Sequence, residues 1–480
     1  MSDNGYMDSF VEENKGRKNE YRDSGGFSDD EDVNGQTESD TPGHNKKINS
    51  FNVSSATEGS QMREKSNNSL SLNFNEFICI NNLLASALGG GSFVFPYILY
   101  QVGIITSLLI YILVSISVYY SLDLLRRFVV DSKYFSFSFI VQKTLGHLWL
   151  KIYTISAFLF YMSCIVNYLD LLFDFNKSMI DFFNDGWGKV IFFLVSCFIE
   201  ILLCLFTNKI SKLHYFSLIV VILFLIITVI LIIKSIFDFK NGDFKKLSLF
   251  TIEDKFHSKP TNWTSFLFIM SKIIEFFYGF IYHSSFPTLL SGLDNISHSN
   301  TRKIQNISYS TLVLIYIIFS FFGCSFYEEK RKEDIIFVDN IDIKNNILKI
   351  IFKTILIILL IALIPIRYVV IRDNYTSLFG MEELPLKYEI LITSICLLIN
   401  NLIVYLTGNS KNFISQLIHY FGGALGVFIC FILPVISYIS INEKAKLRSI
   451  FGYIIGGIFI IIGFFSIFYN FQSKDDGMTN

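Results

Sequence analysis

Two segments that combine glycine, proline and polar residues could bind a small charged ligand. Residues 88–96 contain Gly89, Gly90, Gly91, Ser92 and Phe95, followed by Pro96. Residues 278–287 contain Phe280, Tyr282, His283 and Ser284, followed by Pro287. Glycine lowers the cost of unwinding a helix, and proline removes a backbone donor. We therefore predict that each segment interrupts a helix.

A helix interrupted inside a membrane leaves backbone groups without partners, and this is tolerated only where those groups line a cavity. Freed N–H groups at the start of a half-helix favour an anion, and freed carbonyls at the end of one favour a cation. A free amino acid carries a carboxylate and an ammonium on one carbon and fits this pair of charges. The alternative is that the three glycines only allow close helix packing, as small residues often do in membranes.

If the first interpretation holds, the residues of the two segments divide into a binding site and gates. The backbone groups of Gly89, Gly90, Gly91 and Ser92 would contact the carboxylate. The opposite wall would be lined by Tyr282, His283 and Ser284. The aromatic rings of Phe95 and Phe280 would act as gates.

Two titratable side chains in apolar surroundings are candidates for carrying a proton. His283 lies beside the second predicted break, and imidazole titrates near neutral pH. Glu200 lies deep in an apolar run, where an ionised carboxylate is costly, so it should be neutral, paired or exposed to a cavity. The alternative for Glu200 is a structural hydrogen bond to a neighbouring helix.

Other polar residues and glycines in apolar runs have structural interpretations. Lys272 and Glu275 can share one helix face as an ion pair, or they could form an outer gate. Asn400 and Asn401 could bridge helices. The pairs Gly422/Gly426 and Gly452/Gly456 indicate helix-packing faces.

The elements that must position these residues are apolar and long. Eleven segments reach the roughly 20 residues needed to cross a hydrocarbon core. They lie near 77–99, 102–124, 150–171, 188–206, 214–234, 264–288, 307–327, 348–370, 389–407, 416–440 and 450–470. The breaks fall in the first and sixth, which predicts an inverted repeat of five plus five helices with an eleventh appended. Residues 134–146 are too short and polar to span and are predicted to form an amphipathic interfacial helix.

Composition supports an all-α membrane protein embedded in the lipid bilayer. The chain has 480 residues, of which 52% are hydrophobic and only 17% are charged, and its net charge is -1. This excludes a soluble enzyme and gives no basic field for nucleic acid. The seven cysteines lie in apolar runs without CxxC or Cys/His spacing, so we expect them to be core or lipid-facing residues and expect no metal site.

Residues 1–74 differ from the remainder, the predicted transmembrane domain 75–472. They are rich in Ser, Asn, Asp, Glu and Gly, which predicts a disordered acidic tail. The run from Ser28 to Asp32 offers a phosphorylatable serine and could recruit a cytosolic partner, although a solvated tail without a partner is the alternative. Lysines and arginines in short loops predict a cytosolic N-terminus. The plasma membrane and an acidic internal compartment, vacuolar or lysosome-like, both fit.

Three motifs resemble the amino acid/auxin permease family. The run 82–91 with Pro96, Tyr97 and Gly103 resembles the first-helix signature of that family. Residues 277–327, including the His-Ser-Ser run and 302–306, resemble its neutral amino acid transporters, and 362–365 with Arg372 resembles its eighth helix. The resemblance extends over about 74–470. It implies eleven helices of the LeuT-like type, a cytosolic N-terminus and secondary active transport of amino acids.

The chain departs from sodium-coupled members of that family at three positions. Those members place Asn where this chain has Ala85, and threonines where it has Ile361 and Leu363. Sodium needs oxygen ligands, which these side chains lack. Pro287 also lies one position earlier relative to His283 than in the family pattern. We therefore expect proton coupling or facilitated exchange, not sodium coupling.

Three other classes of function compete with transport by an amino acid carrier. A nutrient sensor would use the same fold and signal through its N-terminal tail. A membrane-embedded enzyme would need a motif such as HExxH, a DHHC-type cluster or paired intramembrane aspartates, and the sequence has none of them. A channel would need a ring of filter residues, and none is evident.

Overall fold

The computed structural model describes residues 72–177, 186–207, 210–240, 262–325, 346–378, 385–407, 418–441 and 446–475. All of them belong to one compact unit, Ser71–Asn480. The predicted disorder of the tail and the acidic run after Ser28 lie outside the described residues, so these two expectations stay predictions.

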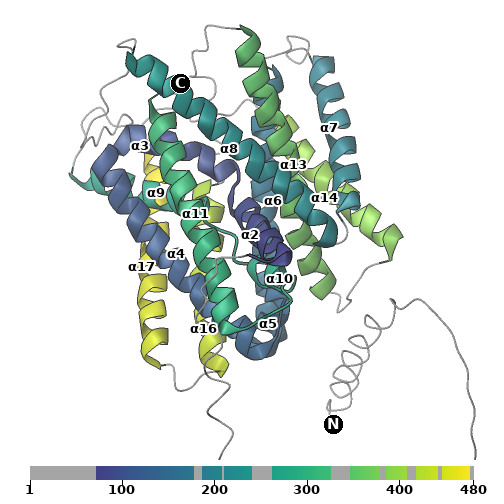
Figure 1. Cartoon of the computed structure of the whole chain (residues 1–480), viewed down its shortest axis with the longest axis vertical. Helices are drawn as coiled ribbons and strands as arrows, with labels where there is room; N and C mark the ends of the chain where they lie inside the picture. The colour runs from purple at the N-terminus through teal and green to yellow at the C-terminus, as the bar shows by residue number, and fades with distance from the viewer. Residues whose placement is uncertain are drawn as a thin grey trace, which may run out of the picture. The chain divides into compact units, whose positions relative to one another are not determined.

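The described part of the chain is helical and contains no strand (Figure 1). Its helices occupy the positions of the eleven predicted apolar segments. They are α2 (Phe74–Ala87), η1 (Gly90–Val94), α3 (Phe95–Val102), α4 (Ile104–Ser132), α5 (Phe137–Leu145), α6 (His147–Lys177), α7 (Gly186–Phe206), α8 (Ile210–Lys240), α9 (Asn262–Tyr278), α10 (Phe286–Leu290), α11 (His298–Cys324), α13 (Asn346–Leu378), α14 (Leu386–Thr407), η3 (Ile418–Gly426), η4 (Phe428–Ile432), α16 (Leu433–Ile441) and α17 (Lys446–Asp475).

Nine helices in the described ranges are long and apolar enough to cross a membrane. A tenth span forms if α2 and the helix after it count as one, bent by 57° at the glycines. The sixth predicted segment holds α9, which has 17 residues, and the short α10. The count of eleven spans therefore stays a prediction, whereas the helical positions agree.

Both predicted breaks are present. Helix α2 ends at Ala87, Gly89 adopts an extended conformation (φ -157°, ψ -177°), and one short 3-10 helix leads into α3. Helix α9 ends at Tyr278, and α10 begins only at Phe286. Pro96 and Pro287 lie in the first turns of α3 and α10, where the missing proline N–H would have had no helical partner.

Helix packing follows the predicted repeat. If two groups of five spans are related by a pseudo-twofold axis, each contact in one group has a counterpart in the other. Helix α2 packs on α8, and correspondingly α9 packs on η3. Helix α3 packs on α11, and correspondingly α10 packs on α4. Helix α17, which the prediction places outside the two groups of five, packs on α9 and η3.

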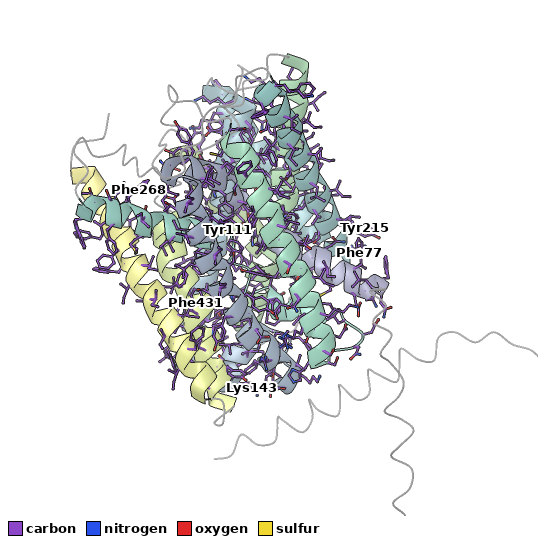
Figure 2. All side chains as sticks on the ribbon, turned by 60° about the vertical axis from the view of Figure 1, so that its left-hand side comes forward. Phe77, Tyr111, Lys143, Tyr215, Phe268 and Phe431 are labelled. Atoms are coloured by element: carbon purple, nitrogen blue, oxygen red, sulfur yellow. The ribbon has the colours of Figure 1, made fainter. Side chains whose placement is uncertain are left out.

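The outer surface of the bundle is apolar, as expected for contact with lipid. Leucine, isoleucine and phenylalanine side chains project outward from α4, α7, α8, α14 and α17. Figure 2 shows two further exposed aromatic side chains, Phe77 of α2 and Tyr215 of α8, at the edge of the molecule. The predicted amphipathic segment forms α5, which buries Phe137, Ile140 and Val141 and leaves Lys143 exposed at one end of the bundle (Figure 2).

The predicted glycine faces are packing positions. A Cβ on Gly422 would lie 2.8 Å from the Tyr278 ring, and one on Gly426 would lie 2.5 Å from Ile281. A Cβ on Gly452 would lie 2.7 Å from Val435. The glycines of η3 thus bring this π-helical segment against the second break. All seven cysteines are buried and free, which confirms them as core residues.

Candidate functional site

The two breaks lie against each other. A Cβ on Gly91 would meet the Tyr278 ring at 2.8 Å and the Cα of Gly279 at 3.2 Å. A Cβ on Gly279 would meet the Phe95 ring at 2.3 Å. Since real Cβ atoms do not approach this closely, only glycine fits at these contacts. The glycines therefore serve both the unwinding that the sequence predicted and the close packing that was its alternative.

The two predicted gates belong to one aromatic cluster. The rings of Phe95 and Phe280 stack with centroids 6.1 Å apart. Tyr316 lies edge-on to both, at 4.9 and 5.2 Å, and Tyr111 lies edge-on to both at 6.1 and 5.6 Å. All four side chains are buried. The cluster closes the space beside the breaks in this conformation.

The carbonyls freed at the ends of the first half-helices are bound by side chains. The Tyr316 hydroxyl lies 2.8 Å from the Ala87 carbonyl oxygen, at the end of α2, and 2.9 Å from that of Gly279, just after α9. Arg367 of α13 donates from Nη1 to the Ser86 carbonyl at 2.6 Å. One tyrosine thus joins both breaks, and one arginine binds the first.

Arg367 is fixed in place by a second contact. Its Nε donates to the Tyr168 hydroxyl at 2.9 Å, and the side chain is 6% exposed. A Cβ on Gly89 would lie 2.4 Å from the Tyr168 hydroxyl oxygen and 2.6 Å from Arg367 Nη2. The first glycine of the run therefore makes room for a guanidinium and a phenol.

The structure separates the predicted binding residues into bonded and unbonded groups. Ser92 donates its hydroxyl back to the Gly89 carbonyl at 2.7 Å, so its side chain stabilises the loop. Gly90 begins η1, within the same loop. Among the described residues, both ring nitrogens of the fully buried His283 lack a hydrogen-bond partner. The Ser284 hydroxyl also lacks a well-aligned bond, although the Tyr153 and Tyr161 hydroxyls lie near it.

Tyr282 and His283 are adjacent, with ring centroids 6.2 Å apart. Tyr282 is 1% exposed, and its carbonyl accepts the Ser285 hydroxyl at 2.9 Å. A fully buried imidazole without partners is unusual, because buried polar groups are normally hydrogen-bonded. The second break therefore presents unsatisfied polar groups to which a ligand or a proton could bind. Their assignment as binding residues stays a prediction.

Glu200 lies apart from the breaks, in the pairing of α7 with α14 (Figure 1). Its carboxyl group accepts the Ser196 hydroxyl of its own helix, and its Oε2 accepts Asn401 Nδ2 at 3.0 Å. This is the hydrogen bond to a neighbouring helix that the sequence analysis offered as the alternative to proton transport. The same bond confirms that Asn401 bridges two helices, as predicted.

The predicted ion pair of α9 is present. Lys272 Nζ lies 2.7 and 3.0 Å from the two carboxyl oxygens of Glu275, and both side chains are buried. The ammonium also lies 5.8 Å from the centroid of the Tyr97 ring on α3. The pair thus connects α9, the first half of the second broken helix, with α3, the second half of the first.

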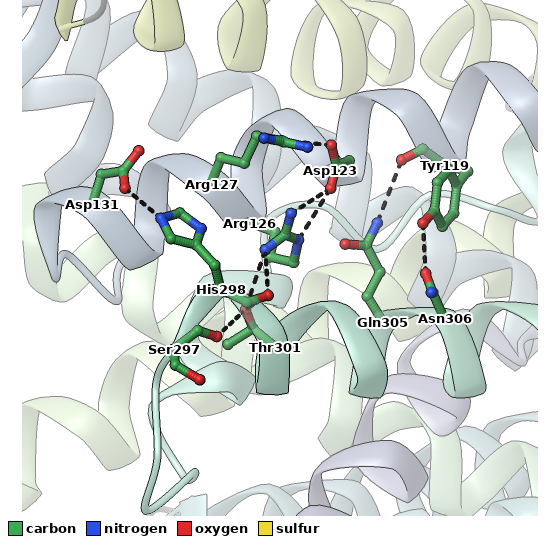
Figure 3. Close-up of polar contacts among 10 residues, drawn as sticks. All are labelled: Tyr119, Asp123, Arg126, Arg127, Asp131, Ser297, His298, Thr301, Gln305 and Asn306. Atoms are coloured by element: carbon green, nitrogen blue, oxygen red, sulfur yellow. Dashed lines mark hydrogen bonds and ion pairs between the residues drawn. The ribbon is translucent and has the colours of Figure 1, made fainter. Parts of the chain in front are cut away.

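A row of polar contacts joins α4 to α11 at one end of the bundle (Figure 3). Arg126 is 1% exposed, bonds Asp123 at 2.6 Å and donates to the His298 carbonyl at 3.2 Å. Nearer the middle of the bundle, the Tyr119 hydroxyl donates to Asn306. Beside this row lies a recess of about 570 Å³ lined by Arg126, Arg127, His298, Ser299, Arg302, Lys303 and Asn306. These contacts hold α4 and α11 together in the conformation observed.

A much smaller recess lies beneath the first break. It has a volume of about 10 Å³ and is bounded by Ser86, Ser285, Thr288 and Asp373 together with apolar side chains. A cavity of this size holds about one water molecule. The polar residues come from α2, from the start of α10 and from α13, so the recess lies between these three helices.

Sequence reasoning missed Arg367, Tyr168, Tyr316 and Asp373. Arg367 had a detectable signal, because an arginine two residues after Pro365 interrupts a strongly apolar run. The tyrosines had none, since they are two among 25 tyrosines in the chain. Only the packing of α6 and α11 against the breaks distinguishes them.

Comparison with known proteins gives a family and a fold. A family model described as transmembrane amino acid transporter protein matches residues 77–473. Sodium-coupled neutral amino acid transporter 4 of Homo sapiens is 25% identical over 196 residues, 39% of this chain and 34% of that protein. The Mus musculus protein of the same name is 25% identical over 177 residues, 36% of this chain and 31% of that protein. The alignment thus spans about a third of the length of these relatives.

Among solved structures, a manganese transporter of Eremococcus coleocola, in complex with an aromatic bis-isothiourea compound, resembles this chain. The TM-score is 0.55 at 12% identity, covering 85% of this chain and 89% of the other. A mutant of the same transporter gives the same TM-score and covers 88% of that chain. At this identity the likeness shows the fold alone, and it confirms the all-α transporter architecture.

Proposed function

Because the chain belongs to the transmembrane amino acid transporter protein family, we propose that it carries amino acids across a membrane by alternating access. The observation that carries this proposal is the contact between two helix breaks, one of which leaves His283 and Ser284 buried without well-aligned hydrogen bonds. Buried polar groups without partners are expected where a polar ligand binds, because the ligand supplies the missing bonds.

The substrate carboxylate would bind backbone N–H groups of the run Gly89, Gly90, Gly91 and Ser92. The opposite wall would consist of Tyr282, His283 and Ser284, and Phe95 and Phe280 would open together as gates. This arrangement is supported by the contact between the two segments in space. Gly91 and Tyr278, which meet there, are 187 residues apart in the sequence.

Coupling to a proton, or facilitated exchange, is proposed in preference to sodium coupling. The curated relatives are named sodium-coupled, whereas Ala85, Ile361 and Leu363 supply no side-chain oxygen. His283 is the first candidate for binding the proton because it lies within the second break. Glu200 is the second, although its bonds to α7 and α14 favour a structural role. The N-terminus would face the cytosol, in the plasma membrane or an acidic internal membrane.

The test is uptake of a panel of labelled amino acids by proteoliposomes, at acidic and neutral outside pH, with sodium or choline. We expect uptake of at least one amino acid that rises in acid and is unchanged when choline replaces sodium. Protein-free liposomes provide the control. Sodium-dependent uptake would contradict the coupling assignment, and no uptake from folded protein would favour a sensor.

A further inference from the structure

The end of α2 is a place where a cation is stabilised. The last carbonyls of a helix have no helical donors, and the helix dipole gives this end a partial negative charge. In this chain the Ser86 carbonyl accepts Arg367 Nη1 at 2.6 Å. The guanidinium thus places a permanent positive charge at the carbonyl end of the first half-helix.

Arg367 has no carboxylate in an ion pair among the described residues, although it is almost fully buried. Its identified partners are one carbonyl and one phenol, Ser86 and Tyr168. A buried charge without a counter-ion is costly, so the helix end and its carbonyls are the groups that offset it. The guanidinium in turn supplies a hydrogen-bond donor and a positive charge to the carbonyl end of α2, so this end needs no free ion.

The second break repeats the arrangement with a neutral donor. The Ala87 and Gly279 carbonyl oxygens converge on the Tyr316 hydroxyl at 2.8 and 2.9 Å. Convergent carbonyls at half-helix ends are the groups with which transporters of this architecture coordinate a cation. A side chain of the protein fills that point of convergence here.

We propose that Arg367 is a built-in cation, which occupies the carbonyl end of α2 where a free coupling ion would otherwise bind. Tyr316 fills the corresponding point between the two breaks. Both donors are covalently part of the chain, so the substrate site assembles at any sodium concentration. This inference rests on the proposed transport function and adds the structural reason for independence from sodium.

The experiment removes the guanidinium of Arg367 by mutation and then adds a soluble guanidinium compound. In purified Arg367→Ala protein, we expect the melting temperature to fall and to recover with methylguanidinium chloride, but not with choline chloride at the same ionic strength. In proteoliposomes, uptake should fall about tenfold or more, because two charge-assisted hydrogen bonds are lost, and should recover in part with methylguanidinium. In the wild type, neither salt should change either quantity.

Arg372→Ala is the matched control. Arg372 lies on the same helix, and it donates to the Thr207 carbonyl away from the breaks. Its removal should produce no response to methylguanidinium. A similar response in both variants would show a general effect of the salt and would overturn the assignment, as would unchanged stability and uptake in Arg367→Ala.

A second pair of variants keeps the test decisive if Arg367→Ala does not fold. Arg367→Lys keeps the charge, and Arg367→Gln keeps polarity and much of the length. The Arg367→Lys variant should have a higher melting temperature and a higher uptake than the Arg367→Gln variant. Equal melting temperatures and equal uptake would contradict a role for the charge. The melting measurement needs no transport. A failure of the transport proposal would therefore appear as absent wild-type uptake, whereas a failure of this inference would appear as a missing response in the variants.

Discussion

Three buried polar side chains in this protein bind polar groups of neighbouring helices. Glu200 on α7 accepts Asn401 of α14, Arg367 of α13 binds the end of α2, and Tyr316 of α11 binds both breaks. In hydrocarbon such groups must find partners inside the protein. Each pairing therefore fixes the position of one helix relative to another. Among the described buried side chains without such a partner, His283 lies in the second break and lacks a partner at both ring nitrogens.

The Glu200–Asn401 pair can be tested by stability. Asn401→Leu should lower the free energy of unfolding by about 1–3 kcal/mol, because Glu200 loses a donor while remaining buried. Glu200→Leu combined with Asn401→Leu should cost less than the sum of the two single changes, as expected for residues in contact. Denaturant or thermal unfolding in detergent measures the three variants. Additive losses would contradict a direct bond between the side chains.

The broken helices depend on glycine at their point of contact. Gly279 meets Phe95, and Gly91 meets Tyr278, so the first and second breaks approach until their backbones nearly touch. The prolines start α3 and α10 on the far side of each break. Each broken helix thus ends and restarts at glycines and prolines that can be recognised in the sequence. The breaks can approach this closely because their glycines have no Cβ atoms.

Gly279→Ala should therefore lower uptake about tenfold or more, because the added methyl group would lie 2.3 Å from the Phe95 ring and would push the breaks apart. Gly457→Ala is the control, since a Cβ there has no neighbour within 4 Å and the residue lies within α17. Uptake by the control should match the wild type. Equal uptake by Gly279→Ala, at equal amounts of reconstituted protein, would refute the site.

The bundle is closed around the breaks in this conformation. The aromatic cluster packs beside them, the α4–α11 contacts join one end of the bundle (Figure 3), and only about 10 Å³ is open between α2, α10 and α13. Under the alternating access proposed above, we expect this small recess to widen on one side of the membrane. The polar residues that bound it would then become exposed to water.

Ser285→Cys tests this opening. Ser285 borders the recess and is 8% exposed, and the native cysteines are all buried, so background labelling should be low. We expect a membrane-impermeant maleimide to label the variant from the side of the N-terminus, and a change of labelling rate when substrate is present. Labelling from the opposite side only would contradict the proposed orientation. A rate that substrate leaves unchanged would argue against opening at α10.

Much of the fold could be predicted because its causes are local in the chain. Long apolar segments must be helices in a membrane, since only helices satisfy their own backbone there, and the glycine and proline runs locate both breaks. The sequence therefore predicted the helical positions, the repeat and both breaks, whereas the placement of 282–284 opposite 89–92 as a binding site stays a prediction. It left open whether Glu200 carries a proton or holds a helix, because hydropathy does not reveal the partner of a carboxyl group.

Amino-acid order alone determined that this chain is a bundle of apolar helices broken at Gly89–Gly91 and near Gly279. It could not determine which groups bind the freed carbonyls, because Tyr168, Arg367 and Tyr316 come from three other helices and meet the breaks only when those helices pack. A hydrogen bond depends on distance in space, and the residues it joins here are 281 positions apart in the case of Ser86 and Arg367. Packing of the helices therefore decided what lies at the two breaks.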